Sequence, residues 1–349
     1  MTPASLTPSM APAARRQMLR ILATTAAVWG VGAGLGWSQG ARAQTAAGTA
    51  SQALRELRIG YQKAAVSLVI LKQQGTLEKR FPATRVRWVE FPAGPQLLEA
   101  LAVGSLDFGL TGDSPPVFAQ AAGKDLLYVG SETPKSDTSA ILVLRDSPLK
   151  TLADLKGRKV ALQKGSSAHY LLVRAVAKAD LQWSDIQPVY LPPADARAAF
   201  ESRSVDAWAI WDPFYAAIEL ALQPRVLTTG RGLTDNGSFY LASRALATQQ
   251  PQVVAALFEE LTRADRQIRD NRPEVIKLVA QFSGLDAGVV SLFLQRRPPS
   301  PVNLLSARDV AGQQRVADSF YALGLIPRPV QVADIVWRPD GAMAAIAAK

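Results

Sequence analysis

Short apolar runs alternate with amphipathic helical stretches along most of this chain, and this alternation limits its fold more than any other feature. The strand-length runs occupy 57–61, 86–91, 108–111 and 127–130, and then 141–144, 160–162, 188–191 and 208–210. Repeated units of a strand followed by a helix predict an α/β fold with mostly parallel strands. From Pro251 onward the apolar residues follow helical spacing, so we expect a mainly helical tail.

The composition removes most kinds of catalytic and metal-binding chemistry. The 349 residues contain no cysteine and one histidine, His169, which excludes Cys nucleophiles, disulfides and Cys/His zinc sites. We therefore expect no cofactor and no metal. The phosphate-loop sequence Gly-Lys-Ser/Thr is absent, which argues against nucleotide hydrolysis. The net charge of +10 favours anionic partners, but without a basic helix or a Lys/Arg block we expect no nucleic-acid partner.

The first 43 residues have the organisation of an export signal. Arg15 and Arg16 precede an uncharged run, 21–39, and Ala41-Arg42-Ala43 follows it. A basic start, an apolar run and an Ala-x-Ala site predict a signal peptide that is cleaved after Ala43, and the paired arginines resemble a twin-arginine signal. The alternative is a membrane anchor that stays attached. A polar tether is expected over 44–53, and the four arginines of the signal account for part of the net charge.

Several strand-to-helix junctions carry glycine, serine or proline where a helix should begin. They are Gly94-Pro95-Gln96, Gly112-Asp113-Ser114-Pro115, Gly165-Ser166-Ser167 and Asp212-Pro213. In open α/β sheets such junctions lie at the carboxyl ends of strands, where unpaired backbone N–H groups and the helix dipole attract anions. Their convergence on one crevice would form an anion site without Lys or Arg at its centre. Each junction could equally be an ordinary capped helix start.

Other residues near these junctions have two interpretations each. Asp113 and Asp212 would repel an anion, so we expect them to cap helices or hold contacts between lobes, unless one of them pairs with the ammonium group of a zwitterion. Trp211 and Tyr61 could border an alkyl chain or pack in the core. His169 could donate to a ligand oxygen, although a lone histidine is more often a capping or packing residue.

Sequence segments from about residue 57 to residue 337 match a known pattern. They include Arg58-Ile59-Gly60-Tyr61-Gln62-Lys63, the stretch from Val89 to Leu101, Thr111-Gly112-Asp113-Ser114-Pro115-Pro116, the stretch from Leu191 to Phe200, and Trp211-Asp212-Pro213. In these segments the chain resembles the substrate-binding proteins of ABC importers for aliphatic sulfonates, within the nitrate, sulfonate and taurine group of periplasmic binding proteins.

The resemblance implies a bilobal type 2 periplasmic binding protein fold, in which two α/β lobes are joined by a two-strand hinge. One lobe would comprise 54–142 and 239–349, and the other 143–238. The ligand would bind between the lobes. The contact loops of the family carry over onto Gln62, Gly94, Pro95, Gln96, Gly112, Asp113, Ser114, Gly165, Ser166, Ser167, His169, Trp211 and Asp212.

The function implied by the resemblance is capture of a small organic sulfonate in the periplasm and its delivery to the membrane permease of an ABC importer. The protein would be a monomer and would catalyse no reaction. A sulfonate is permanently charged at neutral pH and has three acceptor oxygens, so fixed N–H and hydroxyl donors suit it. The alternatives are a receptor of the same fold for taurine, nitrate or a pyrimidine-type solute, and an enzyme on this scaffold that uses His169 or Asp113.

Overall fold

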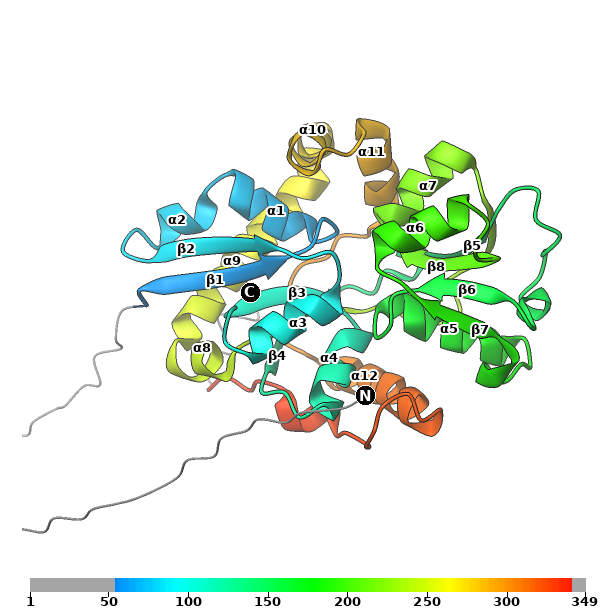
Figure 1. Ribbon diagram of the computed structural model, residues 1–349. Helices are drawn as coiled ribbons and strands as arrows, with labels where there is room; N and C mark the ends of the chain where they lie inside the picture. Colours follow the sequence, from blue (N-terminus) through cyan, green and yellow to red (C-terminus); the bar gives the residue numbers. More distant parts are fainter. Residues whose placement is uncertain (1–53, 341–349) are drawn as a thin grey trace, which may run out of the picture. The chain divides into compact units, whose positions relative to one another are not determined.

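Two five-stranded sheets organise residues 54–340, the part of the chain that the computed structural model describes (Figure 1). The predicted signal peptide and its cleavage site lie outside these residues. The chain passes from the first sheet to the second between Glu132 and Ser139 and returns between Thr229 and Ser238. Two linking segments therefore connect a first lobe, built on the first sheet, with a second lobe, built on the second sheet.

The first sheet has the strand order β2-β1-β3-β10-β4. Its strands are β1 (Glu56–Tyr61), β2 (Arg85–Glu90), β3 (Phe108–Gly112), β4 (Leu127–Glu132) and β10 (Ser238–Ala242). β1 is parallel to β2 and β3, whereas β10 is antiparallel to β3 and β4. The helices that follow the first three strands, as the sequence predicts, are α1 (Val66–Gln73) with α2 (Thr76–Arg80), α3 (Gly94–Ala102) and α4 (Ser114–Ala121).

The second sheet repeats this plan with the order β7-β6-β8-β5-β9. Its strands are β5 (Ser139–Val143), β6 (Lys159–Leu162), β7 (Gln187–Tyr190), β8 (Ala207–Trp211) and β9 (Arg225–Thr229), and its helices are α5 (Ser167–Lys178), α6 (Pro193–Glu201) and α7 (Phe214–Leu222). The strands β5 at Ser139 and β10 at Ser238 begin close to the predicted lobe boundaries. The exact division into lobes stays a prediction.

The sequence pattern missed two strands, β9 and β10. Each lies in an antiparallel pair, and β5 is also antiparallel to both of its neighbours, so the prediction of mostly parallel strands describes only part of each sheet. β5 and β10 are the first strands that the chain forms after it crosses from one lobe to the other. They follow a crossing segment instead of a helix, and the expected alternation of strand and helix fails there.

The tail from Pro251 is helical, as predicted, and its helices cover the first lobe. It contains α9 (Pro251–Asp270), α10 (Arg272–Ser283), α11 (Ala287–Arg296) and α12 (Ala307–Ala322), and the short α8 (Arg244–Gln249) precedes it. The α9 stripe, which includes Val254, Leu257 and Leu261, packs in the same core as the strand residues Leu57 and Ile59. Burial of this stripe stabilises the first lobe through the hydrophobic effect. None of the helices within 54–340 has the length and apolar character that a membrane crossing requires.

Helix contacts join the two lobes. α4 of the first lobe packs against α5 of the second, and α11 of the tail packs against α7. These contacts place the first turns of α4 and α5 opposite each other. The strand-to-helix junctions that the sequence singled out therefore meet at the boundary between the lobes (Figure 1).

Candidate ligand-binding site

A cavity of about 90 Å³ lies between the lobes, bordered by residues that follow strands of both sheets. Its walls combine small and polar residues with a few apolar ones. The lining residues are Gln62, Ala64, Ala65, Gly94, Leu110, Thr111, Gly112, Pro115, Lys135, Thr138, Ser166, Ser167, Trp211, Asp212, Asn236, Ser238, Phe293 and Arg297. A concave site of this kind, with convergent polar groups, is where a small ligand binds most often.

The cavity brings together about half of the residues that the sequence nominated. Those that line it are Gln62, Gly94, Gly112, Ser166, Ser167, Trp211 and Asp212. Those that lie outside its wall are Pro95, Gln96, Asp113, Ser114, Gly165 and His169. The junctions are thus placed as the sequence predicted, but at each of them only some residues face the cavity.

Three helices of the described chain begin near the cavity without a side-chain capping hydrogen bond from their N-cap residues. α3 begins at Gly94, α4 at Ser114 and α5 at Ser167. In the described structure no side chain donates or accepts a capping hydrogen bond at the start of any of the three. Their positive dipole ends therefore face a possible anion, but Pro95 in α3 and Pro115 and Pro116 in α4 have no N–H, so α5 offers the most backbone donors.

Asp113 and Ser114 form a buried pair behind the cavity wall. The Ser114 hydroxyl donates to Asp113 Oδ1 at 2.9 Å, and both residues are buried. Burial raises the pKa of Asp113 to about 6, and hydrogen bonds from Ser114, Ser167 and Thr234 limit that rise. Because Ser167 belongs to the second lobe, Asp113 holds a contact between lobes, which is one of the two roles expected for it.

Asp212 lines the cavity, but its carboxylate is already engaged. Oδ1 accepts a hydrogen bond from the Ala216 N–H at 2.9 Å, in the first turn of α7, and lies 3.1 Å from Arg296 Nη1. Arg296 is the last residue of α11 in the tail. Its guanidinium lies 3.8 Å from the centre of the Tyr215 ring and also pairs with Glu219. Asp212 therefore caps a helix and pairs with Arg296 across the two lobes, while burial outweighs this pairing and raises the pKa of Asp212 to about 7.

The two aromatic residues suggested as an apolar wall have different positions. Trp211 lines the cavity and packs edge-on against Phe214, with ring centres 6.0 Å apart. Tyr61 is 2% exposed and lies in the core of the first lobe, where its hydroxyl donates to Glu90 and accepts from Lys72. Trp211 can border an alkyl chain, whereas Tyr61 cannot reach the cavity from its place in the core.

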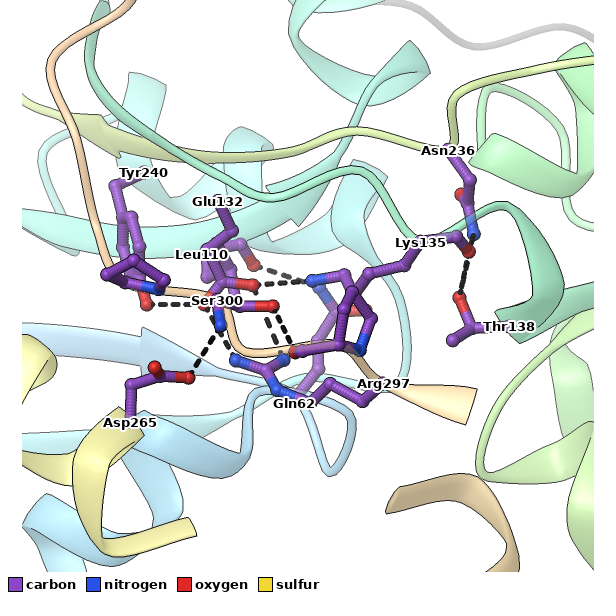
Figure 2. A network of polar contacts seen from close by, with 12 residues as sticks. Gln62, Leu110, Glu132, Lys135, Thr138, Asn236, Tyr240, Asp265, Arg297 and Ser300 are labelled. Atoms are coloured by element: carbon purple, nitrogen blue, oxygen red, sulfur yellow. Dashed lines mark hydrogen bonds and ion pairs between the residues drawn. The ribbon is translucent and has the colours of Figure 1, made fainter. Parts of the chain in front are cut away.

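A buried charged group at the cavity edge was not foreseen from the sequence. Figure 2 shows Glu132, Lys135, Tyr240 and Arg297, here called the Glu132 cluster, meeting from β4, from the first crossing segment, from β10 and from the residue after α11. Glu132 Oε2 lies 2.5 Å from Lys135 Nζ, and Oε1 lies 3.2 Å from Arg297 Nη2. The Tyr240 hydroxyl donates to Oε1 at 2.8 Å.

The Glu132 cluster presents positive charge to the cavity. Lys135 and Arg297 line the cavity, whereas Glu132 lies behind them. Burial tends to raise the pKa of Glu132, but the charges of Arg297 and Lys135 outweigh burial and lower this pKa to about 2. Burial lowers the pKa of Lys135 to about 8, against the attraction of Glu132, so its ammonium persists at neutral pH. Two cationic side chains therefore border the cavity, where the sequence had indicated neutral donors alone.

Arg297 also offers a free hydrogen-bond donor. Its side chain is 4% exposed, and its Nε is buried without a hydrogen-bond partner among the described residues. A buried N–H without an acceptor costs about 1 to 3 kcal/mol. An acceptor atom of a ligand in the cavity would remove this cost.

The Glu132 cluster should stabilise the fold in a pH-dependent way. Because the pKa of Glu132 falls from 4.5 to about 2 on folding, its contribution is complete above pH 4.5 and disappears as the pH falls to 2. We expect Glu132→Gln to lower the free energy of unfolding by about 3 kcal/mol at pH 7 and to cause a smaller loss near pH 3. Urea unfolding at both pH values measures this, with the exposed Glu274→Gln as the matched control. An equal loss at pH 7 and pH 3 would contradict the assignment.

No local pattern in the sequence marks Lys135 or Arg297. Lys135 stands in a crossing segment, and Arg297 stands in the tail next to a second arginine, Arg296. The two side chains meet only because the tail returns to the first lobe beside the crossing. A positive residue next to a Pro in a segment between two apolar runs is the only signal, and it is weak.

Comparison with known proteins identifies the chain's relatives. The model of the NMT1-like family matches residues 50–283. The alkanesulfonate-binding protein SsuA from Xanthomonas axonopodis pv. citri, solved bound to MOPS, is 53% identical, with a TM-score of 0.80 over 82% of this chain and 100% of that chain. The chain belongs to the aliphatic sulfonate-binding proteins of the NMT1-like family.

Two further structures show how far this family likeness extends. The periplasmic aliphatic sulphonate binding protein SsuA from Escherichia coli is 51% identical, with a TM-score of 0.76 over 82% of this chain and 92% of that chain. The desulfurization enzyme DSZB is 17% identical, with a TM-score of 0.59 over 84% of this chain and 98% of that chain. At this identity the second likeness concerns the fold alone. The predicted bilobal periplasmic binding protein fold is confirmed by the sulfonate-binding relatives.

Proposed function

We propose that this protein is an exported receptor that captures an aliphatic sulfonate in the cavity between its lobes and delivers it to the permease of an ABC importer. The observation that carries the proposal is the set of donors at the cavity. Arg297 Nε has no partner among the residues that the structure describes, Lys135 adds a positive charge, and the N-cap residues of α3, α4 and α5 make no side-chain capping hydrogen bond there. A sulfonate has one permanent charge and three acceptor oxygens, so it can use all of these donors.

The same geometry favours an alkanesulfonate over taurine. Taurine adds an ammonium group, which would need a free carboxylate, and Asp212 already pairs with Arg296 and caps α7. Lys135 and Arg297 would repel a second positive charge. The Xanthomonas relative is named an alkanesulfonate-binding protein. Trp211 and Phe293 in the cavity wall suit the alkyl part of such a ligand.

Binding without catalysis fits the position of the only imidazole. His169 lies outside the cavity wall and is enclosed by aromatic rings, so it is unavailable as a general base for a molecule in the cavity. The sulfonate-binding relatives are named as binding proteins. We further propose that the signal peptide is cleaved after Ala43, that the mature chain resides in the periplasm and that it acts as a monomer.

Titration calorimetry with ethanesulfonate, taurine and nitrate tests this function. With the mature chain from Gln44, we expect ethanesulfonate to bind most tightly and taurine to bind at least about tenfold more weakly because of like-charge repulsion. Nitrate lacks the alkyl group that would contact Trp211, so its affinity should also be lower. A preference for nitrate, or the absence of heat with all three ligands, would overturn the proposal.

A further inference from the structure

His169 lies in an aromatic cluster that joins the two lobes. Its ring centre is 5.9 Å from that of Phe118 on α4 and 5.0 Å from that of Phe320 on α12, both in the first lobe. Trp183 and Tyr190 of the second lobe complete the enclosure at 5.3 and 5.6 Å. His169 itself belongs to α5 of the second lobe and is fully buried in this structure. Half of its surroundings therefore depend on contact between the lobes.

The hydrogen bonding of His169 fixes which nitrogen carries the proton. The Gly165 N–H donates to Nδ1 at 3.2 Å, so Nδ1 must be unprotonated. The proton of the neutral ring then lies on Nε2, which is buried without a partner among the described residues. A second proton would break the bond from Gly165 and would place an unpaired charge in an apolar enclosure.

The bond between Gly165 and His169 bears directly on the cavity. Gly165 precedes Ser166 and Ser167, which both line the cavity at the start of α5. Gly165 has a φ of 71°, and a Cβ there would lie 3.3 Å from the Phe118 ring of the first lobe. The loop before α5 is thus held by His169 on one side and faces Phe118 on the other.

We propose that His169 is a positioning residue that couples closure of the lobes to assembly of the anion site, and that closure requires its imidazole to be neutral. The inference rests on the proposed function, because the ligand is the agent that draws the lobes together. When the lobes separate, Phe118 and Phe320 leave the ring and water reaches Nε2. The imidazole can then take up a proton, which opposes closing, so the contribution of His169 to ligand affinity falls in acid.

The groups around the ring determine the direction of this effect. Lys164 and Tyr190 are the titratable residues packed near it, while α4, α12 and Trp183 present apolar rings. Burial, followed by the charge of Lys164, lowers the pKa of His169 to about 3 in this arrangement. With an ordinary value near 6.5 in the open form, the contribution of His169 alone should lower affinity about thirtyfold between pH 7.5 and pH 5.0.

The contributions of Asp113 and Asp212 to the pH dependence of binding must be separated from that of His169. Burial raises the pKa of Asp113 to about 6 and that of Asp212 to about 7 where the lobes touch, so their protonation favours closure in acid. Their contribution therefore has the opposite sign to that of His169. The histidine contribution is the ratio of wild-type affinities at pH 7.5 and 5.0 divided by the same ratio for a variant that lacks the imidazole.

The single histidine of the sequence allows a direct test by NMR. In protein prepared without a histidine tag, the imidazole signal needs no assignment because the chain contains one histidine. We expect it to titrate near pH 6.5 in the free protein and to show no titration down to about pH 5 when ethanesulfonate saturates the site. Binding at pH 7.5 with the same imidazole titration in both states overturns this inference and leaves the proposed function standing. Absence of binding at pH 7.5 overturns both.

Two variants separate the roles of the hydrogen bond and of the charge. His169→Asn places an acceptor near the position of Nδ1 and cannot be protonated, so we expect the thirtyfold histidine contribution to be absent. His169→Phe keeps the ring packing but strands the Gly165 N–H, so we expect affinity about tenfold weaker at pH 7.5. Equal pH ratios in wild type and His169→Asn, or wild-type affinity in His169→Phe, would overturn the proposal. Melting of each ligand-free variant controls for folding.

Discussion

Replacing Arg297 with Gln should weaken ethanesulfonate binding by roughly several hundredfold. Arg297 lines the cavity, its buried Nε has no acceptor within residues 54–340, and its guanidinium supplies charge next to Lys135. Loss of a buried charged donor from an anion site costs about 2 to 5 kcal/mol or more of binding free energy, because the buried anion loses a charged hydrogen-bond partner. Glutamine retains a polar side chain but removes the charge. Calorimetry at pH 7.5 measures the change.

Controls must separate binding from folding in this experiment. Arg297 also pairs with Glu132, so Arg297→Gln should lower the melting temperature, and binding has to be measured well below the transition. Arg297→Lys keeps a positive charge for Glu132 but changes the donor geometry, and we expect intermediate affinity. Arg269→Gln, at a side chain that is 50% exposed and pairs with the exposed Asp270, is the matched surface control. Affinity within twofold of wild type in a folded Arg297→Gln variant would place the anion elsewhere.

The sequence located the strands and helix starts that create the cavity, because those features are local. Gly94, Gly112 and Ser166 could be nominated from composition at a strand end, and all three line the cavity. The sequence pattern also predicted correctly that a helix follows each of the first three strands. Such predictions succeed because turn chemistry and helix caps depend on a few neighbouring residues.

The charged wall could not be predicted because it depends on tertiary contacts. Lys135 reaches the cavity from the crossing segment, and Arg297 reaches it from the end of α11. Their meeting requires the tail to return to the first lobe, and hydrophobic spacing carries no information about that path. The same limit applies to His169, whose position among Phe118 and Phe320 depends on packing between lobes.

The contacts between the lobes surround the cavity. Asp212 and Arg296 join the lobes on the side of α7 and α11, and His169 and Phe118 join them on the side of α5 and α4. Between these contacts, Gly112 at the end of β3 faces Ser167 at the start of α5. Because both of these residues also line the cavity, a change in their spacing should affect closure and ligand binding together.

Adding one methyl group at Gly112 should therefore weaken ethanesulfonate binding by about a hundredfold without destabilising the fold. A Cβ at Gly112 would lie 1.9 Å from Ser167 Oγ and 3.2 Å from Ser167 Cβ. Rotation of the Ser167 side chain could relieve the first contact, but it would break the hydrogen bond to Asp113 and leave the second. In the open form these atoms separate, so the variant should fold normally while closure is hindered.

A double-mutant cycle tests this cause directly. Ser167→Gly removes both atoms that would clash, so adding it to Gly112→Ala should restore affinity to the level of Ser167→Gly alone. Gly312→Ala is the matched control, because a Cβ there meets nothing closer than 3.7 Å. Calorimetry gives the four affinities, and melting in the absence of ligand should give equal midpoints for Gly112→Ala and wild type. Independent, additive losses from the two substitutions would show that the methyl group acts by another route than contact with Ser167.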